Sequence, residues 1–153
     1  IGLNLYSWSE IPEEQVKAKF SRKLISGKRV MLARILLKKG CTVASHKHKS
    51  EQITYVVEGL LELTLPNGKV RVGNGQVLVI PSNIEHSAIA LKDTLEFDVF
   101  SPIREDWLTG QDHTFERGKG KWISARALLS LHLEGVFFIS DAAMPKNALV
   151  LFR

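Results

Sequence analysis

Apolar and polar residues alternate in short runs between residues 20 and 100, as they do in strands that turn one face to a core. Turn residues separate these runs, and Pro66-Asn67-Gly68 predicts a hairpin. Short strands at this spacing indicate an all-β sandwich or barrel. The run 30–37 is apolar except for Arg34, which favours a buried strand. The expected strands cover residues 30–37, 52–57, 60–65, 70–72, 77–80, 86–91 and 94–100.

The pattern changes after residue 100. Residues 104–108 predict one helical turn, residues 111–121 read as a polar linker, and residues 124–132 have helical spacing. Two further strands are expected at 135–139 and 148–152. We therefore expect a β-barrel domain over residues 1–113 and a C-terminal α/β extension over residues 114–153, packed on the barrel or on a partner subunit.

Composition narrows the classes of function. The 153 residues fit one domain, and the net charge of +5 is compatible with a small anionic substrate. Lysines and arginines are scattered, so we expect no nucleic-acid partner. No run approaches the roughly 20 apolar residues of a membrane span, so we expect no membrane partner. Cys41 is the single cysteine, and the beginning of the sequence does not look like a signal peptide, so the cytoplasm is the expected compartment.

Two histidines carry the clearest chemical signal. His46 and His48 are two residues apart, so an extended chain turns both to one face. Gln52 shares their parity and joins them if no bulge intervenes, whereas Glu51 has the opposite parity. Imidazole nitrogens suit Zn, Ni, Fe, Mn and Cu alike. The spacing therefore predicts a divalent metal site of unspecified metal, and a barrel without metal is the alternative.

Residues 28–105 resemble the cupin superfamily, which has two characteristic motifs. The matching positions are Gly40, His46, His48 and Gly59 in the first motif, and Gly75, Pro81 and His86 in the second. Three positions depart from the family pattern, because Gln52 stands for Glu, Asn83 for Gly and Ala90 for Asn. The resemblance implies a double-stranded β-helix, or jelly-roll barrel, and one divalent metal ion held by His46, His48, Gln52 and His86.

A second group of polar residues follows in the last strand. Asp98 and Phe100 share a face, and Arg104 lies just past the strand end. Parity places Asp98 as the only acidic residue on the side of the metal, so it is the expected proton carrier. Arg104 would hold a carboxylate through two hydrogen bonds, and Phe100 would pack on a sugar face.

Structural roles remain open for the same residues. Asp98 could form an ion pair with Arg34, which strand parity also turns inward as a candidate substrate contact. Phe100 could belong to the core, and Arg104 could pair with Glu105 or Asp106.

The set of His-x-His, a glutamine and Asp-x-Phe-x3-Arg resembles the pectin-degradation cupins, which linearise 4,5-unsaturated uronates. The resemblance implies a metal-dependent isomerase that opens the ring of a small carboxylated sugar or acts on a keto acid. A non-catalytic metal- or sugar-binding module and a cupin dioxygenase are the alternatives, and a dioxygenase would need a redox-active metal. Open barrels leave edge strands that proteins tend to cover, so we expect a homodimer in which a strand over residues 3–8 and the apolar tail cover an edge.

Overall fold

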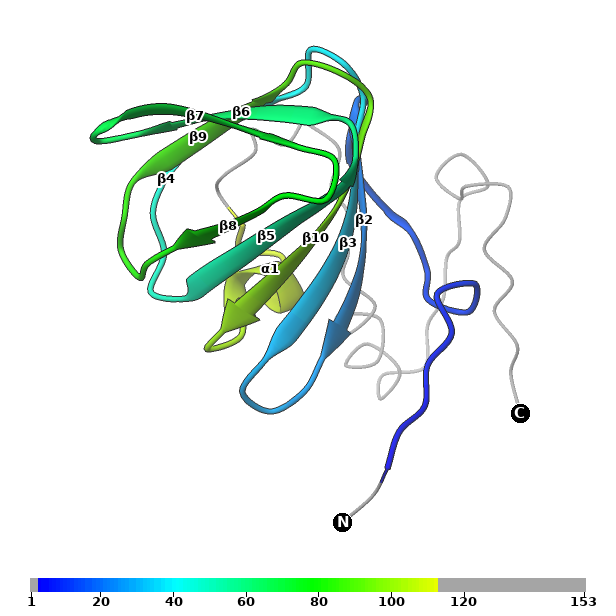
Figure 1. Ribbon diagram of the computed structural model, residues 1–153. Helices are drawn as coiled ribbons and strands as arrows, with labels where there is room; N and C mark the ends of the chain where they lie inside the picture. Colours follow the sequence, from blue (N-terminus) through cyan, green and yellow to red (C-terminus); the bar gives the residue numbers. More distant parts are fainter. Residues whose placement is uncertain (1–2, 113–153) are drawn as a thin grey trace, which may run out of the picture. The chain divides into compact units, whose positions relative to one another are not determined.

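Two antiparallel sheets make up the part of the chain that the computed structural model describes, residues 3–112 (Figure 1). The larger sheet has the order β1-β2-β3-β10-β5-β8, and the smaller sheet has the order β4-β9-β6-β7. The bounds are β1 Glu14–Lys17, β2 Phe20–Ser26, β3 Met31–Leu37, β4 Thr42–His46, β5 Glu51–Glu58, β6 Leu60–Leu65, β7 Gly68–Gly73, β8 Val77–Ile80, β9 His86–Ala90 and β10 Thr94–Ser101. From β3 onward the chain moves repeatedly from one sheet to the other, and this confirms the expected all-β jelly-roll barrel.

The strand expected over residues 30–37 is confirmed as β3, but it is not buried on both faces. Met31, Ala33 and Ile35 are buried, whereas the residues between them are half-buried. The apolar residues of the second face therefore lie on the outside of the barrel, where branched side chains still suit the pleated surface.

Outside the ten strands, one expected element is confirmed and another is wrong. The expected helical turn is α1, Glu105–Thr109, and no helix among the described residues is long and apolar enough to cross a membrane. The strand expected over residues 3–8 is wrong, because this segment forms no ladder with any described strand. The extension expected over residues 114–153 lies outside the described residues.

Gly59 allows the chain to pass from the large sheet at β5 to the small sheet at β6. Its φ of +112° lies in a region that side chains disfavour. A Cβ atom here would lie 2.4 Å from Thr94 Oγ1 and 2.5 Å from the Asp93 carbonyl oxygen. Only glycine fits this crossing, which explains its place in the first motif.

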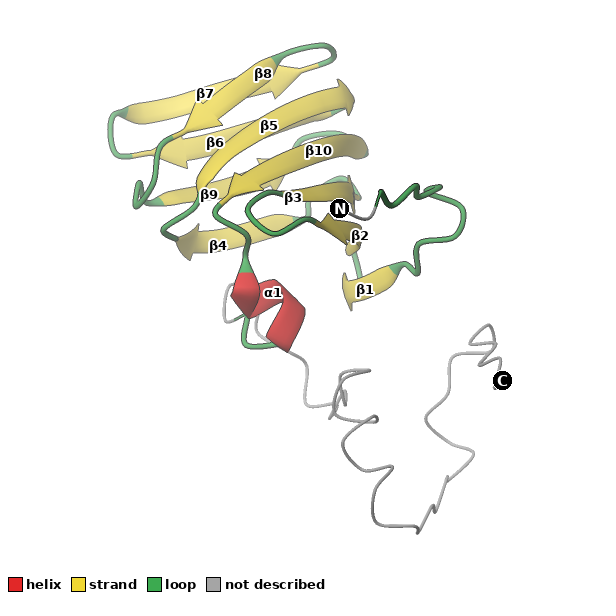
Figure 2. Ribbon diagram, turned by 90° about the horizontal axis from the view of Figure 1, so that it is seen from below, coloured by secondary structure: helices red, strands yellow, loops and turns green. Residues whose placement is uncertain are grey.

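The two sheets face each other across one core (Figure 2). Its apolar members include Ile35 from β3, Val56 from β5 and Leu61 from β6. Strand β10 lies between β3 and β5, so its inward side chains reach the centre of the barrel. Glu96, Asp98 and Phe100 are these inward residues, and all three are buried.

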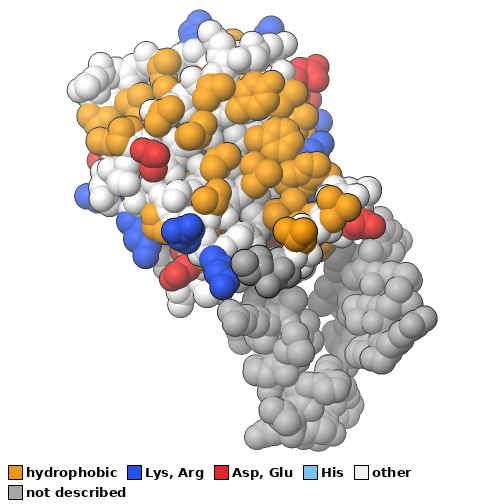
Figure 3. Space-filling view, turned by 60° about the horizontal axis from the view of Figure 1, so that its bottom comes forward, with side chains coloured by type: hydrophobic (Ala, Val, Ile, Leu, Met, Phe, Trp, Pro, Cys, Tyr) orange, Lys and Arg blue, Asp and Glu red, His pale blue; other side chains and the backbone are white. Residues whose placement is uncertain are grey.

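The outer face of the large sheet carries apolar residues in cross-strand rows, and Figure 3 shows apolar side chains gathered on one surface of the barrel. Tyr55 lies opposite both Val77 and Phe97, and Ile53 lies opposite Val79. The N-terminal segment covers only part of this face, where the Trp8 ring packs 5.6 Å from the Phe97 ring. At the β5–β8 end four apolar residues stay exposed: Ile53, Tyr55, Val77 and Val79.

We expect a second copy of the chain to cover this end of the sheet, with the exposed N-terminal Leu3 and Leu5 extending the contact. A stable dimer buries about 800 Å² on each partner. Light scattering at micromolar concentration should give twice the chain mass of 17.2 kDa. A Val77→Lys/Val79→Lys variant should shift toward the single-chain mass, and a wild-type protein that has this mass contradicts the prediction.

Candidate metal centre

Three histidines gather at one end of the barrel interior. His46 ends β4 and His86 begins β9, and these two residues are paired in the small sheet. His48 belongs to the connection from β4 to β5. Nitrogen atoms of the three rings all lie within 4.8 Å of one another, so the set could hold a metal ion. The motif residues that the sequence placed together are therefore together in space.

Backbone carbonyls orient each of these rings. The Nδ1 atoms of His46, His48 and His86 lie 2.9, 2.9 and 2.8 Å from the carbonyl oxygens of Ala44, Ser50 and Ile84, respectively. A carbonyl oxygen only accepts hydrogen bonds, so Nδ1 is the protonated nitrogen in each ring. In the neutral form the Nε2 atoms then carry free lone pairs, which is the arrangement that metal-bound histidine usually has.

Gln52 reaches the same point from the large sheet. It is 7% exposed, and its amide nitrogen donates to Thr54 Oγ1 at 2.9 Å and to Asp98 Oδ2 at 3.1 Å. These two bonds leave its Oε1 atom 3.2 Å from His48 Nε2. Glu51 is exposed, as parity predicted. However, Gln52 does not reach the histidines along one extended strand, as the parity argument assumed. The chain instead passes from the small sheet to the large sheet between His48 and Gln52.

The electrostatics of this cluster suit a cation. Burial lowers the pKa of His46 and His86, and burial together with Arg104 lowers the pKa of His48 to about 4. The three imidazoles are therefore neutral at neutral pH and can act as ligands. Within residues 3–112, His86 Nε2 is buried without a hydrogen-bond partner, and His48 Nε2 faces an oxygen that is also an acceptor. A divalent ion would satisfy these converging lone pairs, so the residues fit the implied metal.

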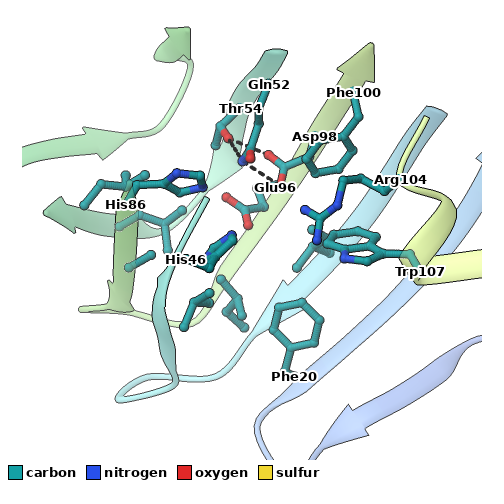
Figure 4. A pocket seen from close by; sticks show the side chains of 16 residues that line it. Phe20, His46, Gln52, Thr54, His86, Glu96, Asp98, Phe100, Arg104 and Trp107 are labelled. Atoms are coloured by element: carbon teal, nitrogen blue, oxygen red, sulfur yellow. Dashed lines mark hydrogen bonds between the residues drawn. The ribbon is translucent and has the colours of Figure 1, made fainter. Parts of the chain in front are cut away.

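Asp98 is built into the ligand cluster. It is 4% exposed and accepts hydrogen bonds from Thr54 at 2.5 Å and from Gln52 at 3.1 Å. Burial raises its pKa to about 6, although Thr54 and Gln52 act in the opposite direction. Figure 4 shows these three side chains joined on one side of the pocket. The carboxylate is therefore a hydrogen-bonded neighbour of a candidate ligand.

The inward orientation expected for Arg34 is wrong. It lies opposite Phe97 on the outer face of the large sheet, whereas Asp98 lies opposite Ala33 on the inner face. The alternative ion pair between Asp98 and Arg34 is excluded for the same reason. Strand parity separates two faces of a strand, but it does not say which face is inside.

Arg104 closes the open end of the barrel, just before α1. It is 4% exposed, and Asp106 accepts bonds from its Nε atom at 2.9 Å and its Nη2 atom at 2.7 Å. Asp106 thus occupies the two-bond position that was expected for a substrate carboxylate. Nη1 is buried and has no hydrogen-bond partner in the described part of the chain, so this atom is the one that Arg104 offers to the cavity.

Aromatic rings hold the Arg104 guanidinium in place. It lies 4.8 Å from the centre of the Trp107 ring and 5.5 Å from the centre of the Phe100 ring. The Arg22 guanidinium packs 4.1 Å from the same Trp107 ring. Sequence reasoning missed Trp107 and Arg22, because they meet only when the end of the described chain folds back onto β2.

The site has two spaces that share lining residues. An inner cavity of about 50 Å³ lies inside the barrel, and Asp98, Gln52 and Glu96 are among its lining residues. An outer cleft of about 590 Å³ is lined by the β4–β5 connection and the start of α1, including Lys47 and Lys49. His46 and Arg104 line both spaces. The outer cleft has the size of a small-molecule site, whereas the inner cavity has room only for a few atoms.

The expectation that Asp98 is the only acidic residue on this side is wrong. Glu96 precedes it by two residues on β10, faces inward and is 5% exposed. The signal was present in the sequence, because residues 96 and 98 share parity.

The fold and the site together define a class of protein. It is an antiparallel β-barrel whose interior brings three imidazoles and an amide oxygen together as a candidate metal site. Residues 33–101 match the family of the cupin domain. The pectin degradation protein KdgF of Dickeya dadantii is 29% identical over 102 residues, which are 65% of this chain and 93% of that protein.

Solved structures agree with this match. KdgF from Halomonas sp. is 31% identical with a TM-score of 0.64, and the similarity covers 69% of this chain and 100% of that one. An RmlC-like cupin from Shewanella frigidimarina has a TM-score of 0.65 at 23% identity, covering 69% of this chain and 96% of that one. The chain belongs to the cupin family, and it resembles the pectin-degradation members.

We expect His86→Ala to abolish stoichiometric binding of Zn²⁺ or Mn²⁺, since it removes a buried ligand atom. Gln52→Ala should weaken binding by at least roughly 10–100-fold, the typical cost of losing a residue that orients a metal ligand. Glu51→Ala is the matched control and should keep the metal. Elemental analysis after dialysis of protein purified without a histidine tag measures all three. The ligand assignment is wrong if Glu51→Ala loses the metal while Gln52→Ala retains it.

Proposed function

We propose that this cupin is a metal-dependent isomerase that opens the ring of 4,5-unsaturated uronates. One observation carries the proposal: the buried carboxylate of Asp98 is hydrogen-bonded to a candidate metal ligand and lines the same cavity as His46, His86 and Arg104. The similarity to two proteins named for KdgF, one of them a pectin degradation protein, supports this class of substrate.

The charge and size of the outer cleft support a small anionic sugar. Its lining carries three basic residues, Lys47, Lys49 and Arg104, against two acidic ones, Glu105 and Asp106, and Asp106 pairs with Arg104. The four candidate ligands are all neutral, so a bound divalent ion keeps its full +2 charge and polarises a carbonyl or hydroxyl oxygen. A carboxylated sugar in the cleft would reach the inner cavity past His46 and Arg104, which line both spaces.

Asp98 is suited to accept a proton. With a pKa of about 6, the carboxylate is mostly ionised at neutral pH, yet it is more basic than an exposed aspartate. Its two hydrogen-bond donors, Gln52 and Thr54, are neutral side chains, and the charge of Arg104 acts on it only from a distance. The geometry therefore supports a general base beside the candidate metal.

Arg104 is suited to bind rather than to transfer protons. Its unpartnered Nη1 atom can donate to a substrate carboxylate, while Asp106 keeps the guanidinium in position. Phe100 is 1% exposed, and its ring packs 5.6 Å from the His48 ring. Phe100 therefore contacts both a candidate metal ligand and Arg104.

The purified, metal-loaded protein should speed the loss of the ultraviolet absorbance of a 4,5-unsaturated uronate. Asp98→Asn should lower kcat by about 10²–10⁴-fold, which is the usual contribution of a positioned general base. Metal content should remain, since asparagine can still accept a hydrogen bond from Gln52. A wild-type protein that leaves the uronate decaying at its spontaneous rate rules out the proposed reaction and leaves a binding module as the alternative.

Arg104→Ala should raise KM with little change in kcat, because a carboxylate contact binds the ground and transition states nearly alike. Loss of one charged hydrogen bond corresponds to a rise of about 10-fold or more. Arg34→Ala removes an equal charge from the outer face and serves as the control, with unchanged KM. Equal effects from the two variants would argue against a substrate contact at Arg104.

A further inference from the structure

Glu96 is a carboxyl group in an apolar position of the barrel. It lies on the inward face of β10, opposite Ile35 on β3 and Val56 on β5, and both neighbours are buried. A leucine or valine at this position would fit the strand pattern without the free-energy cost of burying a carboxyl group. A buried acid that the packing does not need suggests a chemical role.

The carboxyl group points into the inner cavity. Glu96 Oε2 is buried without a hydrogen-bond partner among the described residues, and Figure 4 shows the group between His46 and Asp98. His86 Nε2, Arg104 Nη1 and Trp107 Nε1 are also buried without partners, and all three residues line the same cavity. A water molecule needs roughly 10–15 Å³ and two to four polar partners. The cavity of about 50 Å³ therefore suits a short chain of waters that ends at Glu96.

The surroundings of Glu96 and Asp98, the two buried acids of β10, favour different protonation states. Burial, followed by the nearby charge of Asp98, raises the pKa of Glu96 well above its ordinary value. Burial raises the pKa of the Cys41 thiol, which is electrostatically linked to Glu96, so this thiol stays uncharged at neutral pH. Burial and the unpartnered Oε2 atom favour the protonated form of Glu96, whereas Asp98 accepts two hydrogen bonds, which favour its ionised form. One carboxyl group can donate a proton while its neighbour accepts one.

We propose that Glu96 supplies the second proton of the ring-opening reaction through water in the inner cavity. This inference rests on the proposed function, in which Asp98 is the base. Nothing in the resemblance assigns Glu96 a role, and it is separate from the histidine and glutamine set.

The proton transfers balance without any further reactant. Asp98 takes the hydroxyl proton at C1 of the cyclic hemiacetal, C1 becomes an aldehyde, and the bond from C1 to the ring oxygen breaks. The electron pair of that bond passes to the ring oxygen, which leaves an enolate across C5 and C4. C4 then takes the proton from Glu96 by way of water, and C5 becomes a ketone. The proton on Asp98 returns to Glu96 through the same waters.

Glu96→Gln tests the proposal, because glutamine has the same shape and neutrality but cannot release a proton. We expect kcat to fall by about 10²-fold, the lower end of the contribution of a general acid, while KM and metal content stay within about twofold. Glu58→Gln alters an exposed glutamate on β5 and is the matched control. Thermal unfolding should show that both variants fold. A Glu96→Gln variant with the wild-type kcat overturns the inference while the proposed function stands.

Infrared difference spectroscopy gives a second readout that needs no turnover. The metal-loaded wild type should show a protonated-carboxyl band at neutral pH that Asp98→Asn keeps and Glu96→Gln loses. An ionised Glu96 overturns the inference even if kcat falls. If the wild type shows no ring-opening activity, the proposed function fails first and the role of Glu96 fails with it.

Discussion

Three backbone carbonyl oxygens hold the histidine rings, and the rest of the site depends on this restraint. Each ring gives its Nδ1 hydrogen to the backbone, so each neutral Nε2 directs a lone pair into the barrel. Gln52 adds an oxygen because Thr54 and Asp98 accept both hydrogens of its amide. Several acceptors facing one another repel unless a cation lies among them. The arrangement therefore makes chemical sense as a metal site and little sense as a packed core.

The same restraint extends outward through the two sheets. His46 and His86 belong to the small sheet, whereas Gln52 belongs to the large sheet, so these candidate metal ligands come together only when the sheets face each other. Asn83, which replaces the glycine of the second motif, has a φ of +63° and donates its backbone hydrogen to the His48 carbonyl at 2.8 Å. Asparagine tolerates this conformation better than most residues. The departure from the family pattern therefore keeps the loop beside the site intact.

Polarity inside the barrel is concentrated where chemistry is proposed. Buried polar atoms without partners each cost about 1–3 kcal/mol, and proteins rarely keep many of them. Of the five such side-chain atoms among the described residues, four belong to residues that line the inner cavity, namely His86, Glu96, Arg104 and Trp107. The free-energy cost of these unpartnered atoms therefore falls mainly on one cavity. This concentration separates a functional cavity from an ordinary packing defect, and it joins the candidate metal, the two acids and the arginine in one space.

The sequence by itself determined the strand pattern, the paired motifs and the histidine pair, because these depend on local spacing and on turn residues such as Gly59 and Pro81. Tertiary structure decided which strand face is inside. Parity is only relative, so it placed Asp98 correctly, turned Arg34 inward wrongly, and passed over Glu96 although 96 and 98 share a face. Gln52 lies beside the histidines as expected but for a different reason, since a change of sheet brings it there. Contacts such as that of Arg22 with Trp107 join β2 to α1, and no local pattern encodes an encounter between residues so distant in the chain.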